Sequence, residues 1–237
     1  MARFLRFLLA LAALPLCAAL GRVLWVAVFA SKELNAAEGL PAGAIAFAGG
    51  FVAFFALLLV CPSPMRTYVL GHELTHALWG LAFGARVSNI KVAASGGSVM
   101  LSKSNVWITL APYFFPFYTA VVALIALVVR IFVDPLPWPL AWIFAVGFTW
   151  CFHVHFTLHA LFQRQPDVLE YGRLFSWAFI WIANVLGVLA VLCAATSLTC
   201  AHAASILGDA VCAAYSWTWE CGVWLFRAIV GLFGNGA

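Results

Sequence analysis

The sequence predicts an all-α protein: a polytopic transmembrane helical bundle of about six spans, with a short β-hairpin or re-entrant loop after the third. Three observations support this class. Of the 237 residues, 66% are hydrophobic and 8% are charged, whereas soluble domains carry about 25% charged residues. The apolar residues gather in runs of the length that a helix needs to cross a bilayer, about 20 residues. The 21 Phe and 11 Trp residues suit lipid-facing and interfacial positions.

Six apolar runs account for most of the chain. The first resembles a signal peptide at its start, but it continues to residue 30, which favours an uncleaved helix. Pro112 and Pro116 predict a kink at the start of the fourth run. Asp209 and Glu220 interrupt an apolar tail, which predicts a C-terminal interfacial helix or a seventh span over about 203–233. The six predicted spans are residues 4–30, 41–61, 66–84, 106–133, 138–163 and 171–198.

Composition also predicts the location of the protein. We expect a single integral membrane domain over residues 1–237, multi-pass, in a bacterial cytoplasmic membrane, with the lipid bilayer as its surroundings. The net charge of +4 is spread along the chain and forms no basic cluster, so no nucleic-acid partner is expected. The seven Cys residues include no C-x-x-C pair and predict no disulfide framework. A single Cys200–Cys212 or Cys212–Cys221 disulfide remains open.

The longest polar stretch is 85–105, ARVSNIKVAASGGSVMLSKSN. Val, Ile and Ser alternate in it around Gly96-Gly97, which favours a short β-hairpin or a re-entrant loop. A solvated loop between two spans is the other interpretation.

The third apolar run contains His72-Glu73-Leu74-Thr75-His76, an H-E-x-x-H motif. Two histidines four residues apart project from one helical face and can bind the same Zn²⁺. The glutamate beside them can then take a proton from water. Ionisable groups in an apolar helix are costly, and this favours a functional site. A hydrogen-bonded pair of core histidines, with Glu73 bonded to one of them, is the alternative.

Over roughly 66–185 the chain resembles the site-2 protease-like intramembrane zinc metallopeptidases. The resemblance lies in the H-E-x-x-H motif, in GARVSNIKVAASGGSV after it, and in the next span, which opens with Ala111-Pro112. It implies a metallopeptidase-like core at about 66–200. It also implies hydrolysis of a peptide bond in or near a transmembrane segment of a membrane-protein substrate. The expected partners are that substrate helix and a possible regulatory membrane protein.

The resemblance implies a zinc (Zn²⁺) cofactor held by His72 and His76, with Glu73 as the catalytic base. In this family a third ligand, an Asp, comes from a later helix, usually within L-D-G. That sequence is absent here, and the candidate is Asp167 in Gln165-Pro166-Asp167-Val168-Leu169-Glu170-Tyr171-Gly172. Glu170, His155 and His159 are its rivals. The loop around Gly96-Gly97 is expected to pair with an unwound substrate as an added strand.

Other polar residues in the predicted spans leave several interpretations open. His153, His155 and His159 could form a second metal site or proton path, could line the active site, or could bond neighbouring helices together. Asn184 could contact a substrate or a neighbouring helix. Two other functions also remain open: a catalytically silent scaffold or assembly subunit that kept the motif, and a metal transporter.

Overall fold

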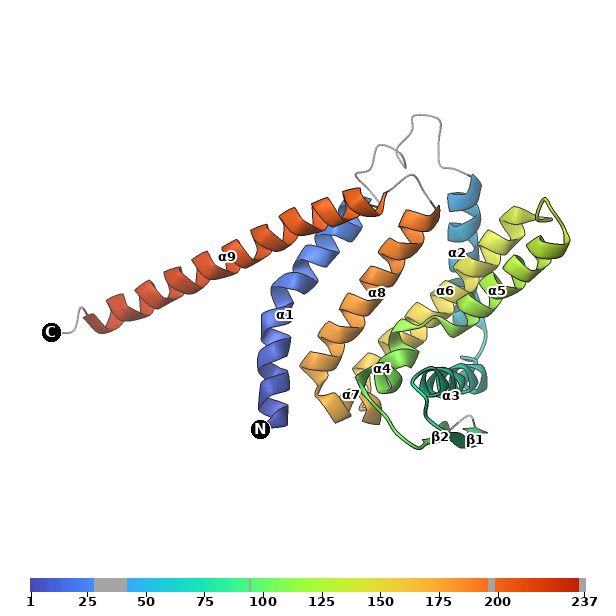
Figure 1. The fold of residues 1–237 in the computed structure, drawn as a ribbon, viewed down its shortest axis with the longest axis horizontal. Coiled ribbons are helices and arrows are strands. Elements are labelled where there is room, and N and C mark those ends of the chain that lie inside the picture. Colours follow the sequence, from blue (N-terminus) through green and yellow to red (C-terminus); the bar gives the residue numbers. More distant parts are fainter. Residues whose placement is uncertain (28–41, 94, 196–198, 235–237) are drawn as a thin grey trace. The chain divides into compact units, whose positions relative to one another are not determined.

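The computed structural model describes residues 1–27, 42–93, 95–195 and 199–234 (Figure 1). They form an all-α polytopic protein with one small antiparallel hairpin after the third helix, as the sequence predicted. The chain divides into two compact units, Met1–Ala36 with Trp177–Ala237, and Ala37–Ser176. In chain order the elements are α1 (Ala2–Trp25), α2 (Ala42–Val60), α3 (Met65–Ala82), β1 (Val87–Ala93), β2 (Gly96–Leu101), α4 (Val106–Phe114), α5 (Phe117–Phe132), α6 (Pro139–Phe162), α7 (Pro166–Tyr171), α8 (Arg173–Ala195) and α9 (Cys200–Gly234).

Within the described residues, four helices are long and apolar enough to cross a membrane: α1, α2, α6 and α8. The pair α4 and α5 makes a fifth candidate if the two count as one broken span, with a bend of 75° between them. Pro112 lies inside α4 and Pro116 caps α5, so the predicted kink is present. The count is therefore four or five, where the sequence suggested about six.

Helix α3 is the predicted span that fails this criterion. It forms where the motif predicted a helix, but Arg66, His72, Glu73 and His76 reduce its apolar character. Figure 1 views α3 nearly end-on, whereas α2 and α6 of the same unit run up the picture, so α3 crosses these two helices steeply. Helix α9 forms over the predicted tail and is not among the candidate spans of the described residues.

The unit Ala37–Ser176 is built on close contact between α2 and α6. A Cβ atom at Gly50 would overlap the carbonyl oxygen of Phe144, and one at Gly147 would overlap that of Phe47. Small residues allow membrane helices to approach to backbone contact. Phe156 of α6 is buried beside this contact, and Tyr68 of α3 stacks on it with ring centroids 4.6 Å apart. Helix α3 thus rests on α6 through an aromatic pair.

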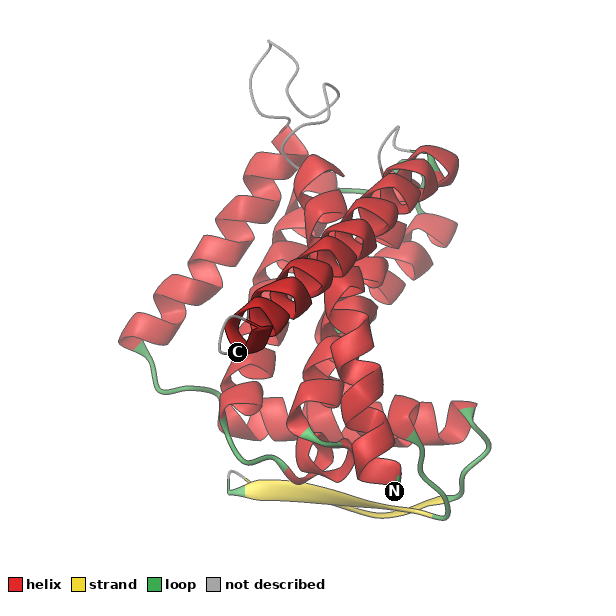
Figure 2. Ribbon diagram, turned by 90° about the vertical axis from the view of Figure 1, so that its left-hand side faces the viewer, coloured by secondary structure: helices red, strands yellow, loops and turns green. Residues whose placement is uncertain are grey.

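Strands β1 and β2 follow α3 after a turn at Gly84, which has a φ of 71°. They pair antiparallel from Val87 with Leu101 to Ala93 with Gly96, and the register shifts between Ser88 and Lys91. In Figure 2 the two strands lie side by side as one extended ribbon. The hairpin prediction for 85–105 is confirmed, and the solvated-loop alternative is wrong.

In the other unit, α1 packs against α8 and α9 around Leu20, Val23 and Val185. All seven cysteines are free. The two disulfides left open by the sequence are ruled out by geometry, because Cys200, Cys212 and Cys221 all lie on α9. Residues nine apart on a helix are separated by about 13 Å, far beyond the reach of a disulfide.

Candidate metal centre

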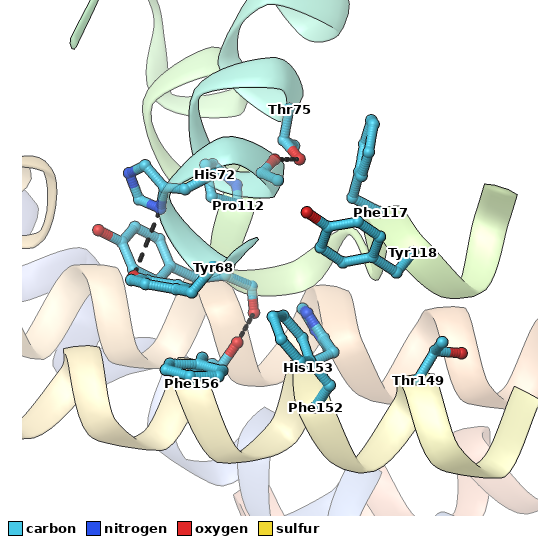
Figure 3. Close-up of a pocket in the computed structure, with 13 residues that line it drawn as sticks. Tyr68, His72, Thr75, Pro112, Phe117, Tyr118, Thr149, Phe152, His153 and Phe156 are labelled. Carbon is cyan, nitrogen blue, oxygen red and sulfur yellow. Dashed lines mark hydrogen bonds between the residues drawn. The ribbon is translucent and has the colours of Figure 1, made fainter. Parts of the chain in front are cut away.

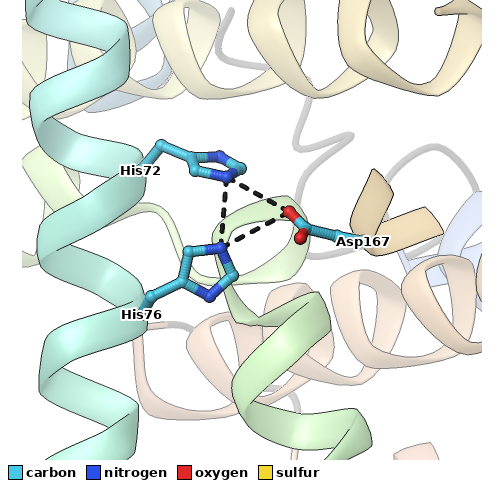
Figure 4. A group of neighbouring side chains, drawn as sticks. All are labelled: His72, His76 and Asp167. Atoms are coloured by element: carbon cyan, nitrogen blue, oxygen red, sulfur yellow. Dashed lines mark hydrogen bonds and ion pairs between the residues drawn. The ribbon is translucent and has the colours of Figure 1, made fainter. Parts of the chain in front are cut away.

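The H-E-x-x-H motif forms one turn in the middle of α3. The helix puts the imidazoles of His72 and His76 on the same side, and their Nε2 atoms lie 3.2 Å apart (Figure 4). His76 is buried, with an exposed fraction of 8%. Local helix geometry is sufficient to bring these two side chains together, because residues i and i+4 are neighbours on a helix surface.

Asp167 of the short helix α7 completes the group. Its Oδ2 atom lies 3.2 Å from Nε2 of His72 and 3.4 Å from Nε2 of His76. Figure 4 shows the carboxylate facing both imidazoles from the opposite side of the group. The structure therefore brings together the three residues predicted as metal ligands. Glu170, His155 and His159, which the sequence left as rivals for the third position, are not part of this group.

The three ligand atoms form a nearly equilateral triangle with sides of 3.2, 3.2 and 3.4 Å. Atoms bound at about 2.0–2.2 Å to a tetrahedral zinc ion lie about 3.3–3.6 Å from one another. The triangle thus has nearly the size of one face of such a tetrahedron. Two imidazoles and a carboxylate could hold a metal ion here and would leave one position open.

The contacts behind His76 favour a metal-binding tautomer. Its Nδ1 lies 2.9 Å from the carbonyl oxygen of Ile108 in α4, and only a protonated Nδ1 can donate to that oxygen. In the neutral ring, Nε2 then carries the lone pair, and it faces the triangle. Histidine ligands are commonly oriented through such a bond from the other ring nitrogen. His72 has a longer contact of this kind, 3.5 Å from Nδ1 to the hydroxyl of Tyr68.

The carboxyl group of Asp167 is held in its ionised form. Burial by itself would raise the pKa of Asp167, but the interactions with His72 and His76 outweigh burial and lower it below the usual range. Asp167 therefore remains a carboxylate, the form that binds metal ions. Tyr113 also donates a hydrogen bond of 2.9 Å to Oδ2 of Asp167. Tyr113 was not predicted as a site residue, and its place directly after Ala111-Pro112 is the one signal that could have indicated it.

Glu73 is buried beside the triangle without belonging to it, with an exposed fraction of 6%. Gly97 of β2 lies against its side chain. A Cβ atom at Gly97 would come within 2.7 Å of Oε1 of Glu73 and within 2.6 Å of Cγ1 of Val69. Only glycine allows the hairpin backbone to approach the carboxylate so closely. Burial raises the pKa of Glu73, and the two neighbouring histidines partly oppose this effect.

A cleft of about 740 Å³ opens beside these residues. His72, Glu73 and His76 line one wall, and Asp167 and Glu170 lie on another. The hairpin contributes residues of β2 and of the turn before it, and none of the described residues of β1. Strand β2, and not the described part of β1, therefore borders the cleft. The β2-side residues are Ser95, Gly96, Gly97, Ser98, Val99 and Leu101.

A second, smaller cavity of about 30 Å³ also borders His72 and lies between α3, α4, α5 and α6 (Figure 3). His153 lines it together with His72 and Tyr68. Of the three histidines on α6, His153 is the one that lines this cavity with His72. His155 and His159 stack on each other with ring centroids 6.2 Å apart. Among the described residues the triangle is the one group of three potential ligands, so the second metal site that the sequence left open is not formed there.

In α8 the side-chain amide of Asn184 donates to the carbonyl oxygen of Ile180. The fold and the site together define a class: a multi-pass helical membrane protein whose His72, His76 and Asp167 could hold a metal ion. In comparisons with protein-family models, curated proteins and solved structures, none matched this chain. Its function therefore has to be argued from the site itself.

Proposed function

We propose that the chain is an intramembrane zinc metallopeptidase that hydrolyses a peptide bond in or near a transmembrane segment of a membrane-protein substrate. The observation that carries the proposal is the combination of a ligand triangle of zinc dimensions with a buried glutamate beside it. Two histidines, one carboxylate and an open fourth position are the donor set of many catalytic zinc sites. A zinc ion held there would supply the Lewis acidity that activates water and polarises a carbonyl group.

The chain's own residues would do the rest of the chemistry. Glu73 is next to His72 in sequence, is buried and is not one of the three ligands, so its carboxylate is available as a general base. It would take a proton from the attacking water and then give one to the leaving amine. Water can reach Glu73 from the cleft that it lines.

The position of β2 beside the cleft favours a peptide substrate that binds in extended form. A transmembrane helix has all its backbone groups bonded internally, so its peptide bonds resist attack until the helix unwinds. An unwound segment added to β2 as a third strand would regain backbone hydrogen bonds. Because Gly97 touches Glu73, such a strand would pass beside the base.

Two other functions are less well supported. A catalytically silent scaffold has no need for three ligand atoms within 3.4 Å of one another. The absence of L-D-G favours a scaffold only weakly, because Asp167 lies beside the two histidines without that motif. A metal transporter needs several ligand groups along one path, and the described residues contain a single group of three.

The decisive experiment is metal analysis of the purified full-length protein beside a His76→Ala variant. Wild type should contain about one zinc per chain, and the variant should contain much less. Absence of zinc from wild type would support the scaffold. Movement of zinc into liposomes that contain the protein would support the transporter. Cleavage of a co-expressed transmembrane substrate that depends on His76 would support the peptidase.

A further inference from the structure

Tyr113 contacts two of the three proposed ligands from a helix that carries none of them. Its hydroxyl group donates to Oδ2 of Asp167 at 2.9 Å. Its ring meets the ring of His72 edge to face, with centroids 5.5 Å apart and an interplanar angle of 75°. The side chain is almost fully buried, with an exposed fraction of 1%. Such a residue is held in place by its surroundings and can impose that position on its neighbours.

Asp167 depends on an outside contact for its orientation. Helix α7 has only six residues, too few to be stable through its own hydrogen bonds. The last torsion of an aspartate side chain is also soft, so a carboxylate turns readily unless it is bonded. The backbone of α7 is tied by the bond from Ser176 Oγ to the carbonyl oxygen of Val168. The carboxylate itself accepts a hydrogen bond from the phenol of Tyr113.

The phenol donates to the same oxygen that faces both imidazoles. A hydrogen bond to Oδ2 fixes the plane of the carboxylate and selects one oxygen for the triangle. A carboxylate that turned to offer both oxygens would occupy two coordination positions and fill the one that the reaction needs. The position of Tyr113 is itself fixed from α6, because Thr157 Oγ1 lies 3.4 Å from its carbonyl oxygen.

We propose that Tyr113 is a positioning residue of the metal centre, which holds Asp167 as a single-oxygen ligand and thereby keeps the fourth position open. This inference rests on the proposed function, because it requires that His72, His76 and Asp167 bind a metal ion. It assigns to Tyr113 no contact with the reacting atoms.

The test compares Tyr113→Phe with Tyr118→Phe in the full-length protein. Phenylalanine keeps the ring that packs on His72 and removes only the hydroxyl group. Tyr118 is a matched control, since its hydroxyl donates to the backbone of the same helix α3, at the carbonyl oxygen of Thr67, and bonds no proposed ligand. Zinc affinity is measured by competition with a chromophoric chelator, and helix content by circular dichroism verifies the fold of each variant.

Tyr113→Phe should bind zinc roughly 10- to 100-fold more weakly than wild type, the usual effect of removing an outer contact to a ligand. Tyr118→Phe should bind it as wild type does. After substitution with Co²⁺, the strong visible absorption of a four-coordinate ion should weaken in Tyr113→Phe, because a freed carboxylate can add its second oxygen. An affinity and a cobalt spectrum identical to those of wild type in Tyr113→Phe would overturn the proposal.

A double-mutant cycle with Asp167→Ala tests whether Tyr113 acts through Asp167. In the Asp167→Ala background, Tyr113→Phe should cause no further loss of zinc affinity. An equal loss in both backgrounds would overturn the positioning role, because the lost affinity would then not depend on Asp167. Failure of the metal centre itself is distinguished by His76→Ala, because wild-type affinity in that variant would overturn the proposed function and this inference with it.

Discussion

The Nε2 atom of His72 lies 3.2 Å from the Oδ2 atom of Asp167, although α3 and α7 are separated in sequence by the hairpin and three helices. The same oxygen lies 3.4 Å from His76. The proposed zinc site depends on this contact between the Asp167 carboxylate and the two histidines of a distant helix.

Replacement of Asp167 by Ala should lower zinc affinity by more than the roughly 10- to 100-fold loss typical of an outer contact, because one of three protein ligands is removed. Glu170→Ala is the matched control, since Glu170 lines the same cleft but lies outside the triangle. It should bind zinc as wild type does. If Asp167→Ala kept its zinc while His155→Ala or His159→Ala lost it, the third ligand would be an imidazole from α6.

Glu73→Gln should retain zinc and lose cleavage of a transmembrane substrate. The amide keeps the size of the side chain but cannot accept the proton from water, and removal of a general base typically costs about 10²- to 10⁴-fold in rate. Zinc content and cleavage are measured on the same preparation. Loss of zinc would identify Glu73 as a ligand, and undiminished cleavage would refute its role as base.

Gly97→Ala should impair cleavage and leave zinc binding unchanged. Its new Cβ atom would lie within 2.7 Å of Oε1 of Glu73, so either the hairpin or the carboxylate must move. Ser98→Ala serves as the control, because it alters the neighbouring position of β2 without adding an atom near Glu73. Equal cleavage rates in wild type and Gly97→Ala would mean that the contact of the hairpin with Glu73 has no part in the reaction.

Zinc affinity should fall on acidification from about pH 8 to pH 5, because an imidazole must be neutral to bind a metal ion. Burial by itself would lower the pKa of His76, but the contacts with Asp167 and with the carbonyl oxygen of Ile108 raise it. The pKa of Asp167 is lowered by His72 and His76 against the opposing effect of burial. A group with a lowered pKa remains ionised above that value, so Asp167 stays charged throughout this range and the histidines set the acid limit. Chelator competition between about pH 5 and 8 measures the profile. A fall confined to the range below about pH 4, where free carboxyl groups titrate, would contradict the histidine ligands.

Gly50→Ala should destabilise the unit that carries the site, since the added methyl group would overlap the carbonyl oxygen of Phe144 across the contact of α2 with α6. Overpacking of this kind costs about 1–3 kcal/mol or more. Gly187→Ala is the control, because a Cβ atom there meets nothing within 4 Å. Thermal unfolding of the two variants in the same detergent compares them, and an unchanged midpoint for Gly50→Ala would show that the helices can move apart at little cost.

The sequence by itself determined the features that depend on composition and local geometry. Apolar runs longer than a bilayer is thick predicted α1, α2, α6 and α8 as spans, because burial in lipid requires little more than length and hydrophobicity. The spacing of His72 and His76 predicted two adjacent imidazoles, because a helix fixes the relation of residues four apart. Alternation around Gly96-Gly97 predicted the hairpin in the same local way.

Only the tertiary structure decided which distant groups meet. Asp167, Glu170, His155 and His159 were all compatible with the sequence as the third partner, and the packing of α7 near α3 selected Asp167. Packing of α4 against α7 brought Tyr113 to Asp167, and packing of β2 against α3 brought Gly97 to Glu73. It also turned α3 across α2 and α6, where a spanning helix had been predicted (Figure 1). These relationships join residues from separate elements, so they follow from the packing of whole helices and leave no periodic pattern in the sequence.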